Sequence, residues 1–88
     1  MTREEQEWED YSFIERAKLR KKALEHLSEP ITPRKLANAL NIALSEGSRI
    51  LIELTKQKLA KCLTPKIKYN RYYALTQRGK KVREKFVK

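Results

Sequence analysis

Residues 36–54 read LANALNIALSEGSRILIEL, and their pattern is the strongest structural signal in the chain. Apolar residues recur at helical spacing in its first part, LANAL, and again in its last part, RILIEL. Between them stands Asn41, a residue type that tolerates the left-handed backbone conformation in which many helices end. We therefore predict two helices joined by a tight turn, the second beginning near Ala43 or Ser45 and ending near Gln57.

The flanking residues extend this pattern. Thr32 and Pro33 form a helix start, because a hydroxyl can cap the first turn and the amide hydrogen that proline lacks is not needed there. β-favouring residues follow at 61–64 and 71–76, and no proline or glycine interrupts residues 2–27. The predicted elements are an N-terminal helix over 1–28, a helix pair over 33–58, a hairpin over 59–76 and a C-terminal helix over 77–88.

The helix pair resembles a helix-turn-helix unit. Such units favour a small residue where the helices cross, and Ala37 stands there. Asn41 stands four residues later, at the position of positive φ, and Ile50 stands at the aliphatic position thirteen residues after Ala37. Gly47 departs from the pattern because a branched aliphatic residue is usual at its position. We expect it to thin the core and to weaken the helix by about 1 kcal/mol relative to alanine.

Three further segments resemble archaeal winged-helix transcriptional regulators. They are ERAKLRKKAL at 15–24, KCLTP at 61–65 and RYYALTQRGKKV at 71–82. The resemblance implies a winged helix-turn-helix fold, mainly α with a small β-hairpin (α+β), as a single DNA-binding domain over residues 1–88. It also implies a dimer.

The charge distribution points to the same kind of ligand. Residues 1–15 hold one basic and six acidic side chains, a net charge of −5, whereas residues 16–88 hold 20 basic and five acidic ones, a net charge of +15. So strong a bias costs self-repulsion and is typical of proteins with a polyanionic partner. A merely soluble basic surface is the alternative.

The second helix of the pair is expected to read DNA bases with the face opposite its aliphatic stripe. The predicted outward residues are Ser45, Ser48, Arg49, Ile52 and Lys56. Arg49 is the predicted reader of a guanine edge through two hydrogen bonds, and Ile52 is placed to touch a thymine methyl group. The alternatives are a solvated surface arginine at 49 and a helix phase that differs by one residue.

The hairpin and the start of the first helix of the pair are predicted to contact the DNA backbone. The predicted wing contacts are Lys66, Lys68, Tyr69, Asn70 and Arg71. The predicted phosphate contacts are Thr32, Arg34 and Lys35, since backbone amides and positive charge coincide there. A solvated loop is the alternative for the wing. Within the second strand, Tyr73 is expected in the core and Tyr72 at the surface.

Apolar residues near both ends of the chain predict a homodimer interface. They are Trp8, Tyr11, Val82 and Phe86. An exposed apolar cluster usually marks an interface, here a helix contact across a twofold axis. The alternative is that both ends pack on each other within one chain. The acidic cluster at residues 4–10 is expected to tune solubility or to contact the basic half of a partner subunit.

The sequence predicts no enzyme, metal site or cofactor. His26 and Cys62 are single residues of their types and fall short of a four-ligand zinc set, so metal or redox sensing is a weak alternative. We find no phosphate-binding glycine loop and no nucleophile–histidine–acid arrangement. No apolar run approaches the roughly 18 residues that span a bilayer. We therefore expect a cytoplasmic, nucleoid-associated protein with no membrane contact and no evident small-molecule effector.

Together these observations predict sequence-specific binding of double-stranded DNA by a homodimeric transcriptional regulator. The alternatives are a general architectural or replication-associated DNA-binding protein and a winged-helix protein–protein adaptor.

Overall fold

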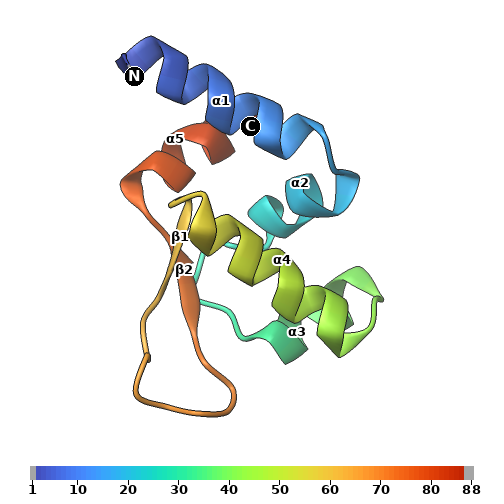
Figure 1. Cartoon of the computed structure of the whole chain (residues 1–88). Coiled ribbons are helices and arrows are strands. Elements are labelled where there is room, and N and C mark those ends of the chain that lie inside the picture. The colour runs from blue at the N-terminus through green and yellow to red at the C-terminus, as the bar shows by residue number, and fades with distance from the viewer. Residues whose placement is uncertain (1, 87–88) are drawn as a thin grey trace.

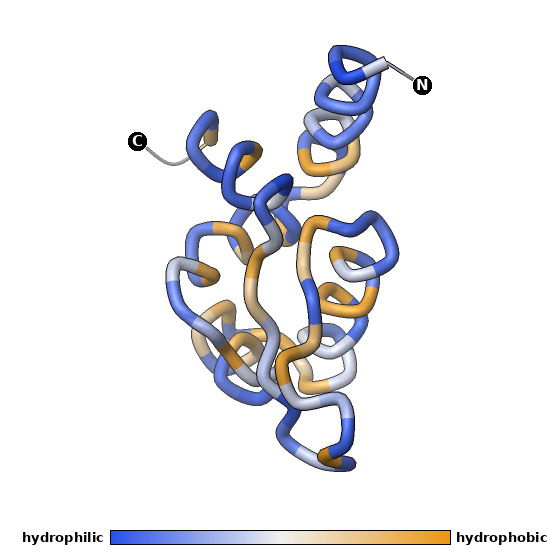
Figure 2. Tube along the Cα trace, turned by 90° about the vertical axis from the view of Figure 1, so that its left-hand side faces the viewer, coloured by the Kyte–Doolittle hydropathy of each residue, from blue (hydrophilic) through white to orange (hydrophobic). Residues whose placement is uncertain are grey.

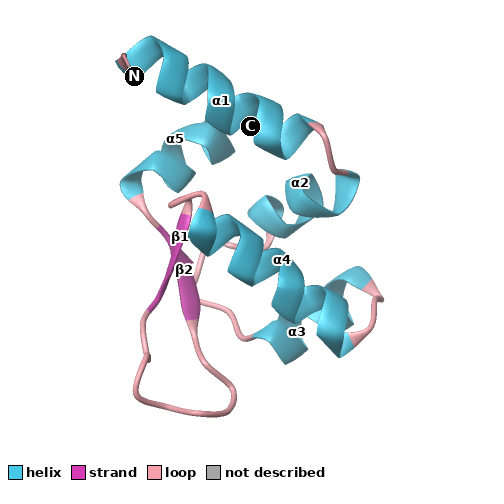
Figure 3. Cartoon of the chain, in the orientation of Figure 1, coloured by secondary structure: helices cyan, strands magenta, loops and turns pink. Residues whose placement is uncertain are grey.

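The structure is a computed structural model that describes residues 2–86. Its elements in chain order are α1 (Arg3–Glu15), α2 (Lys18–Glu25), α3 (Pro33–Leu40), α4 (Leu44–Lys56), β1 (Ala60–Cys62), β2 (Tyr73–Leu75) and α5 (Gln77–Phe86) (Figure 1). The predicted fold class, mainly α with one small antiparallel hairpin, is confirmed (Figure 3). Met1 and the last two residues of the predicted C-terminal helix lie outside the described residues.

The helix pair forms where the sequence predicts it. The Thr32 hydroxyl accepts a hydrogen bond from the backbone N–H of Lys35 at 3.2 Å, and Pro33 is the first residue of α3. The helix ends at Asn41, whose φ of 56° is the left-handed conformation predicted for the turn. α4 begins at Leu44, between the two predicted starts and without a side-chain cap. Local sequence therefore sets both ends of α3.

α3 and α4 cross at Gly47, and here the structure corrects the expectation. A Cβ atom on Gly47 would lie 2.9 Å from the carbonyl oxygen of Pro33 and 3.0 Å from Cβ of Ala37. The helices therefore approach through their smallest residues, as predicted for Ala37. The prediction that Gly47 thins the core is wrong, because the position has no room for a branched side chain.

The N-terminal segment forms two helices, so the prediction of one helix over 1–28 is also wrong. The chain leaves helical geometry at Ala17, whose φ and ψ are −142° and 117°. The Arg20 guanidinium explains the bend: it lies 3.9 Å from the Phe13 ring centroid and donates to the Phe13 carbonyl oxygen at 2.9 Å and to the Glu53 carboxylate at 3.1 Å. These tertiary contacts outweigh the helix-forming preference of the segment.

The hairpin pairs Ala60 with Leu75 and Cys62 with Tyr73 in antiparallel register. Its strands have three residues each, and Ile31 adds a bridge on the other side of Tyr73 through two hydrogen bonds of 2.9 Å. Tyr73 is buried and Tyr72 is 48% exposed, as predicted. The loop over residues 63–72 projects away from the helices (Figure 1), and we call it the wing loop.

The core lies where the helices meet the hairpin. In Figure 2 most apolar segments gather there, and most of the outer turns are hydrophilic. The largest fully buried apolar side chains are Ile14, Leu24, Leu36, Leu51, Leu54 and Leu59. α1 and α5 pack against each other at one end of this core, and the wing loop lies toward the other end (Figure 1).

Candidate nucleic-acid interface

The outward face of α4 is the one that the sequence predicts. Ser45, Arg49, Ile52 and Lys56 are exposed and Ser48 is half-buried, whereas Gly47, Ile50, Leu51 and Leu54 are buried. The predicted helix phase is therefore confirmed. The part that these side chains play in binding stays a prediction.

A groove of about 510 Å³ joins this face to the wing loop and to the start of α3, and we call it the α4–wing groove. Its lining residues are Pro33, Arg34, Leu44, Ser48, Ile52, Lys68, Tyr69, Asn70, Arg71 and Tyr73. Three of these side chains carry positive charge, and within residues 2–86 none of the lining residues is acidic. The groove therefore has a cationic rim around walls that are partly apolar.

Arg49 lies outside the α4–wing groove. It lines a separate hollow of about 350 Å³ between α2 and α4, together with Lys18, Arg20 and Glu53. Arg20 and Glu53 form an ion pair of 3.1 Å there. Arg49 is thus on the side of the exposed face that is nearer to α2, beside Lys18, a cation that the sequence reasoning did not single out. Only the packing of α2 against α4 brings the two together.

The wing loop is held by its own hydrogen bonds. Arg71 donates through Nε to the carbonyl oxygen of Ile67 at 2.6 Å, and the hydroxyl of Thr64 accepts from the backbone N–H of Tyr72 at 3.0 Å. Tyr69 is 75% exposed, and the Lys68 ammonium lies 5.9 Å from its ring centroid. Arg71 therefore braces the loop as well as lining the groove, while Lys66, Lys68 and Asn70 are exposed around it.

Of the three predicted phosphate contacts at the start of α3, two are exposed and one already serves the helix. Arg34 and Lys35 are exposed, and Arg34 lines the α4–wing groove. Thr32 is half-buried, and its hydroxyl already accepts the capping hydrogen bond of α3. Its hydroxyl hydrogen can still donate to a phosphate oxygen.

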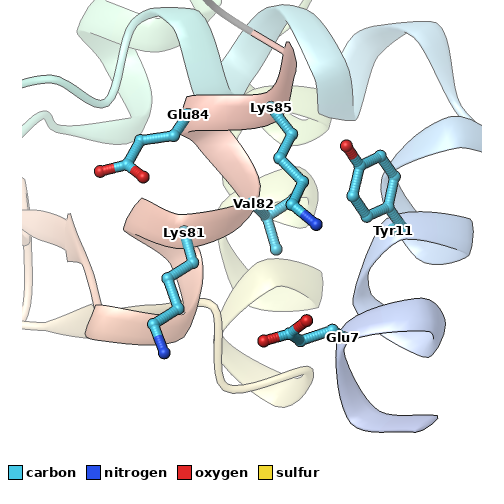
Figure 4. Close-up of a pocket in the computed structure, with 6 residues that line it drawn as sticks. All are labelled: Glu7, Tyr11, Lys81, Val82, Glu84 and Lys85. Carbon is cyan, nitrogen blue, oxygen red and sulfur yellow. The ribbon is translucent and has the colours of Figure 1, made fainter. Parts of the chain in front are cut away.

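The two ends of the chain meet within one molecule. Tyr11 and Phe86 have ring centroids 4.9 Å apart, Val82 is buried, and the Lys85 ammonium lies 4.8 Å from the Tyr11 ring. Figure 4 shows Tyr11 on α1 facing Val82 and Lys85 on α5 across a pocket of about 290 Å³. The intramolecular alternative therefore accounts for Tyr11, Val82 and Phe86. Of the four predicted interface residues, Trp8 remains largely exposed, at 75%.

Asp10 has a role that the sequence reasoning missed. It is 2% exposed, and its carboxylate accepts two hydrogen bonds from Arg78, of 2.8 and 3.1 Å, and one from Gln57 of 3.1 Å. The hydrogen bond to Asp10 raises the pKa of Arg78 above its ordinary value, against an opposing effect of burial. One member of the acidic cluster thus joins α1, α4 and α5 instead of facing solvent. No local signal marks it, because Arg78 lies 68 residues away.

Residues 2–86 hold no cluster of three or more histidine, cysteine, aspartate or glutamate side chains arranged for a metal ion. In the same part of the chain, no helix is long and apolar enough to cross a membrane.

Comparison with solved structures places this fold among known ones. No protein-family model matches the sequence, and no curated protein matches it. RV1404 from Mycobacterium tuberculosis is 27% identical, with a TM-score of 0.68 over 77% of this chain and 48% of that one. SP03579, a MarR family transcription regulator, is 28% identical, with a TM-score of 0.67 over 77% of this chain and 47% of that one. This chain matches about half the length of each, and the predicted winged helix-turn-helix fold is confirmed.

Proposed function

We propose that this chain binds double-stranded DNA in a sequence-specific manner and acts as a transcriptional regulator of the archaeal winged-helix type. The α4–wing groove carries the proposal, because it joins the exposed face of α4 to the cations of the wing loop and no carboxylate of residues 2–86 lines it. An α-helix with a free polar face fits the major groove of DNA, and flanking cations fit the backbone phosphates. The likeness to a MarR family transcription regulator supports the same function.

The side chains divide into two roles. Arg49 reads a guanine edge, assisted by the short donors Ser45 and Ser48, and Lys56 extends the same face. The backbone contacts come from Arg34 and Lys35 and from the wing loop. Because Arg49 is exposed on the side of α4 away from the wing, the bases that it reads lie on the side of the site nearer to α2.

The proposal includes a homodimer. Its contact would be made by Trp8 on α1, which is 75% exposed and so accessible to a second copy. A twofold axis near α1 would place two α4 helices on half-sites about one turn of DNA apart, roughly 34 Å. Sedimentation of a monomer at micromolar concentration would remove the dimer from the proposal.

Competition binding tests the function itself. Duplexes selected from a random pool should bind roughly 10³-fold or more tightly than the unselected pool at the same salt concentration. A general architectural protein would show little preference between the two. A protein–protein adaptor would bind neither duplex, even at low salt.

Two substitutions test the division of roles. Arg49→Ala should cost about 1–3 kcal/mol of binding free energy and relax the preference at one base pair. Lys68→Ala should weaken binding to every sequence and lower the salt dependence by about one counterion. Lys80→Ala, at an exposed position on α5, is the matched control and should change the salt dependence less. If Lys68 altered sequence preference and Arg49 did not, the two roles would be assigned wrongly.

A further inference from the structure

Two large aliphatic side chains are exposed on the DNA-facing side of α4. Leu44 is 47% exposed and Ile52 is 43% exposed, although the helix already buries Ile50, Leu51 and Leu54 on its other side. Leu44, Ser48 and Ile52 are spaced four residues apart, so they form one stripe along the helix. The stripe faces the wing loop across the α4–wing groove.

The surroundings of this stripe indicate its occupant. The groove that Leu44 and Ile52 line is bordered by the cations of Arg34, Lys68 and Arg71. An occupant must therefore be anionic at its edges and carry apolar groups in its middle. In the major groove of DNA the apolar group that the bases present is the thymine C5-methyl, and the phosphates lie at the edges.

We infer that Leu44 and Ile52 form a thymine-reading pair, each covering the methyl group of one thymine in the bound site. This inference rests on the proposed function and adds to it which bases the wing side of α4 prefers. The two residues are eight positions apart, which is about 12 Å along an α-helix. With about 3.4 Å between successive bases, the two thymines should be about three to four base pairs apart.

Replacing thymine by uracil tests the inference, because it removes the methyl group and keeps the base pairing. In a duplex selected with the wild-type chain, each thymine is replaced singly and the affinity is measured by fluorescence anisotropy. Uracil at each of two positions, three to four base pairs apart, should weaken binding about fourfold, the effect of one buried carbon group. Uracil elsewhere should change little.

Variants assign each methyl group to its side chain. Leu44→Ala should abolish the sensitivity to uracil at one position, and Ile52→Ala at the other. Leu63→Ala is the matched control, since Leu63 is 44% exposed and does not line the α4–wing groove, and it should keep both sensitivities. Circular dichroism should show all three variants folded, because each truncated side chain is only about half buried and lies outside the core.

The outcomes separate this inference from the proposed function. A chain that binds no duplex overturns both. Sequence-specific binding with no response to uracil, or with responses that survive in both Leu44→Ala and Ile52→Ala, overturns the thymine-reading pair alone. If these two variants bind every duplex as tightly as the wild type, the stripe serves another occupant, such as a protein, and the inference is wrong.

Discussion

Gly79→Ala is expected to lower the free energy of unfolding by about 3–4 kcal/mol, more than most single substitutions do. Gly79 is buried in the first turn of α5, and a Cβ atom there would overlap the carbonyl oxygen of Leu59. That oxygen accepts a hydrogen bond of 3.0 Å from the backbone N–H of Thr76, whose hydroxyl in turn donates to the carbonyl oxygen of Lys58 at 2.7 Å. These hydrogen bonds hold the backbone of Lys58 and Leu59 against Thr76. An added methyl group at Gly79 would therefore force α5 to move.

Urea unfolding followed by circular dichroism measures this loss. Alanine favours a helix by about 1 kcal/mol over glycine, so a gain in stability is the result expected if α5 had free space around Gly79. Gly47→Ala is the informative comparison, because its Cβ atom would meet the Pro33 oxygen at 2.9 Å, a milder contact. It should lose less stability than Gly79→Ala, and the reverse order would contradict the packing described here.

Asp10→Ala is expected to cost about 2–3 kcal/mol of unfolding free energy. Breaking a buried ion pair typically costs 3–5 kcal/mol because one charge is left without its partner. The loss should be smaller here, since the Arg78 side chain is 33% exposed and regains water. Gln57 also loses the hydrogen bond that it makes to the same carboxylate.

The control for this substitution is Glu7→Ala, which removes an exposed carboxylate from the same helix. It should change the unfolding free energy by no more than about 0.5 kcal/mol. Asp10→Asn retains the shape and some hydrogen bonds and should fall between the two. Equal stability of Asp10→Ala and Glu7→Ala would show that the hydrogen bonds of Asp10 to Gln57 and Arg78 add nothing to the free energy of unfolding.

The ends of α3 could be predicted from the sequence because their signals are local. Thr32 and Pro33 start α3, and Asn41 ends it, because capping and left-handed geometry depend on residues within one turn. The bend at Ala17 could not be predicted in that way. It depends on Arg20 reaching Glu53, a partner 33 residues away, in a segment with no helix-breaking residue.

The candidate site shows the same division. The helical spacing of α4 is enough to predict that Arg49 and Ile52 face outward, and both do. The spacing alone does not predict which other parts of the chain lie beside each of these two side chains. The structure sets Ile52 in the α4–wing groove and Arg49 beside Lys18. The outward position of Leu44 could also have been predicted from the sequence. It lies eight residues before Ile52, which places both residues on the same side of α4.

Amide chemical-shift mapping by NMR shows both whether the chain binds DNA and which residues bind it. On addition of a selected duplex, the largest shifts should fall on residues 44–56 of α4 and on residues 66–71 of the wing loop, with α1 and α5 little changed. Shifts concentrated on α1 and α5, or none at low salt, would contradict the proposal that this face of α4 and the wing read DNA.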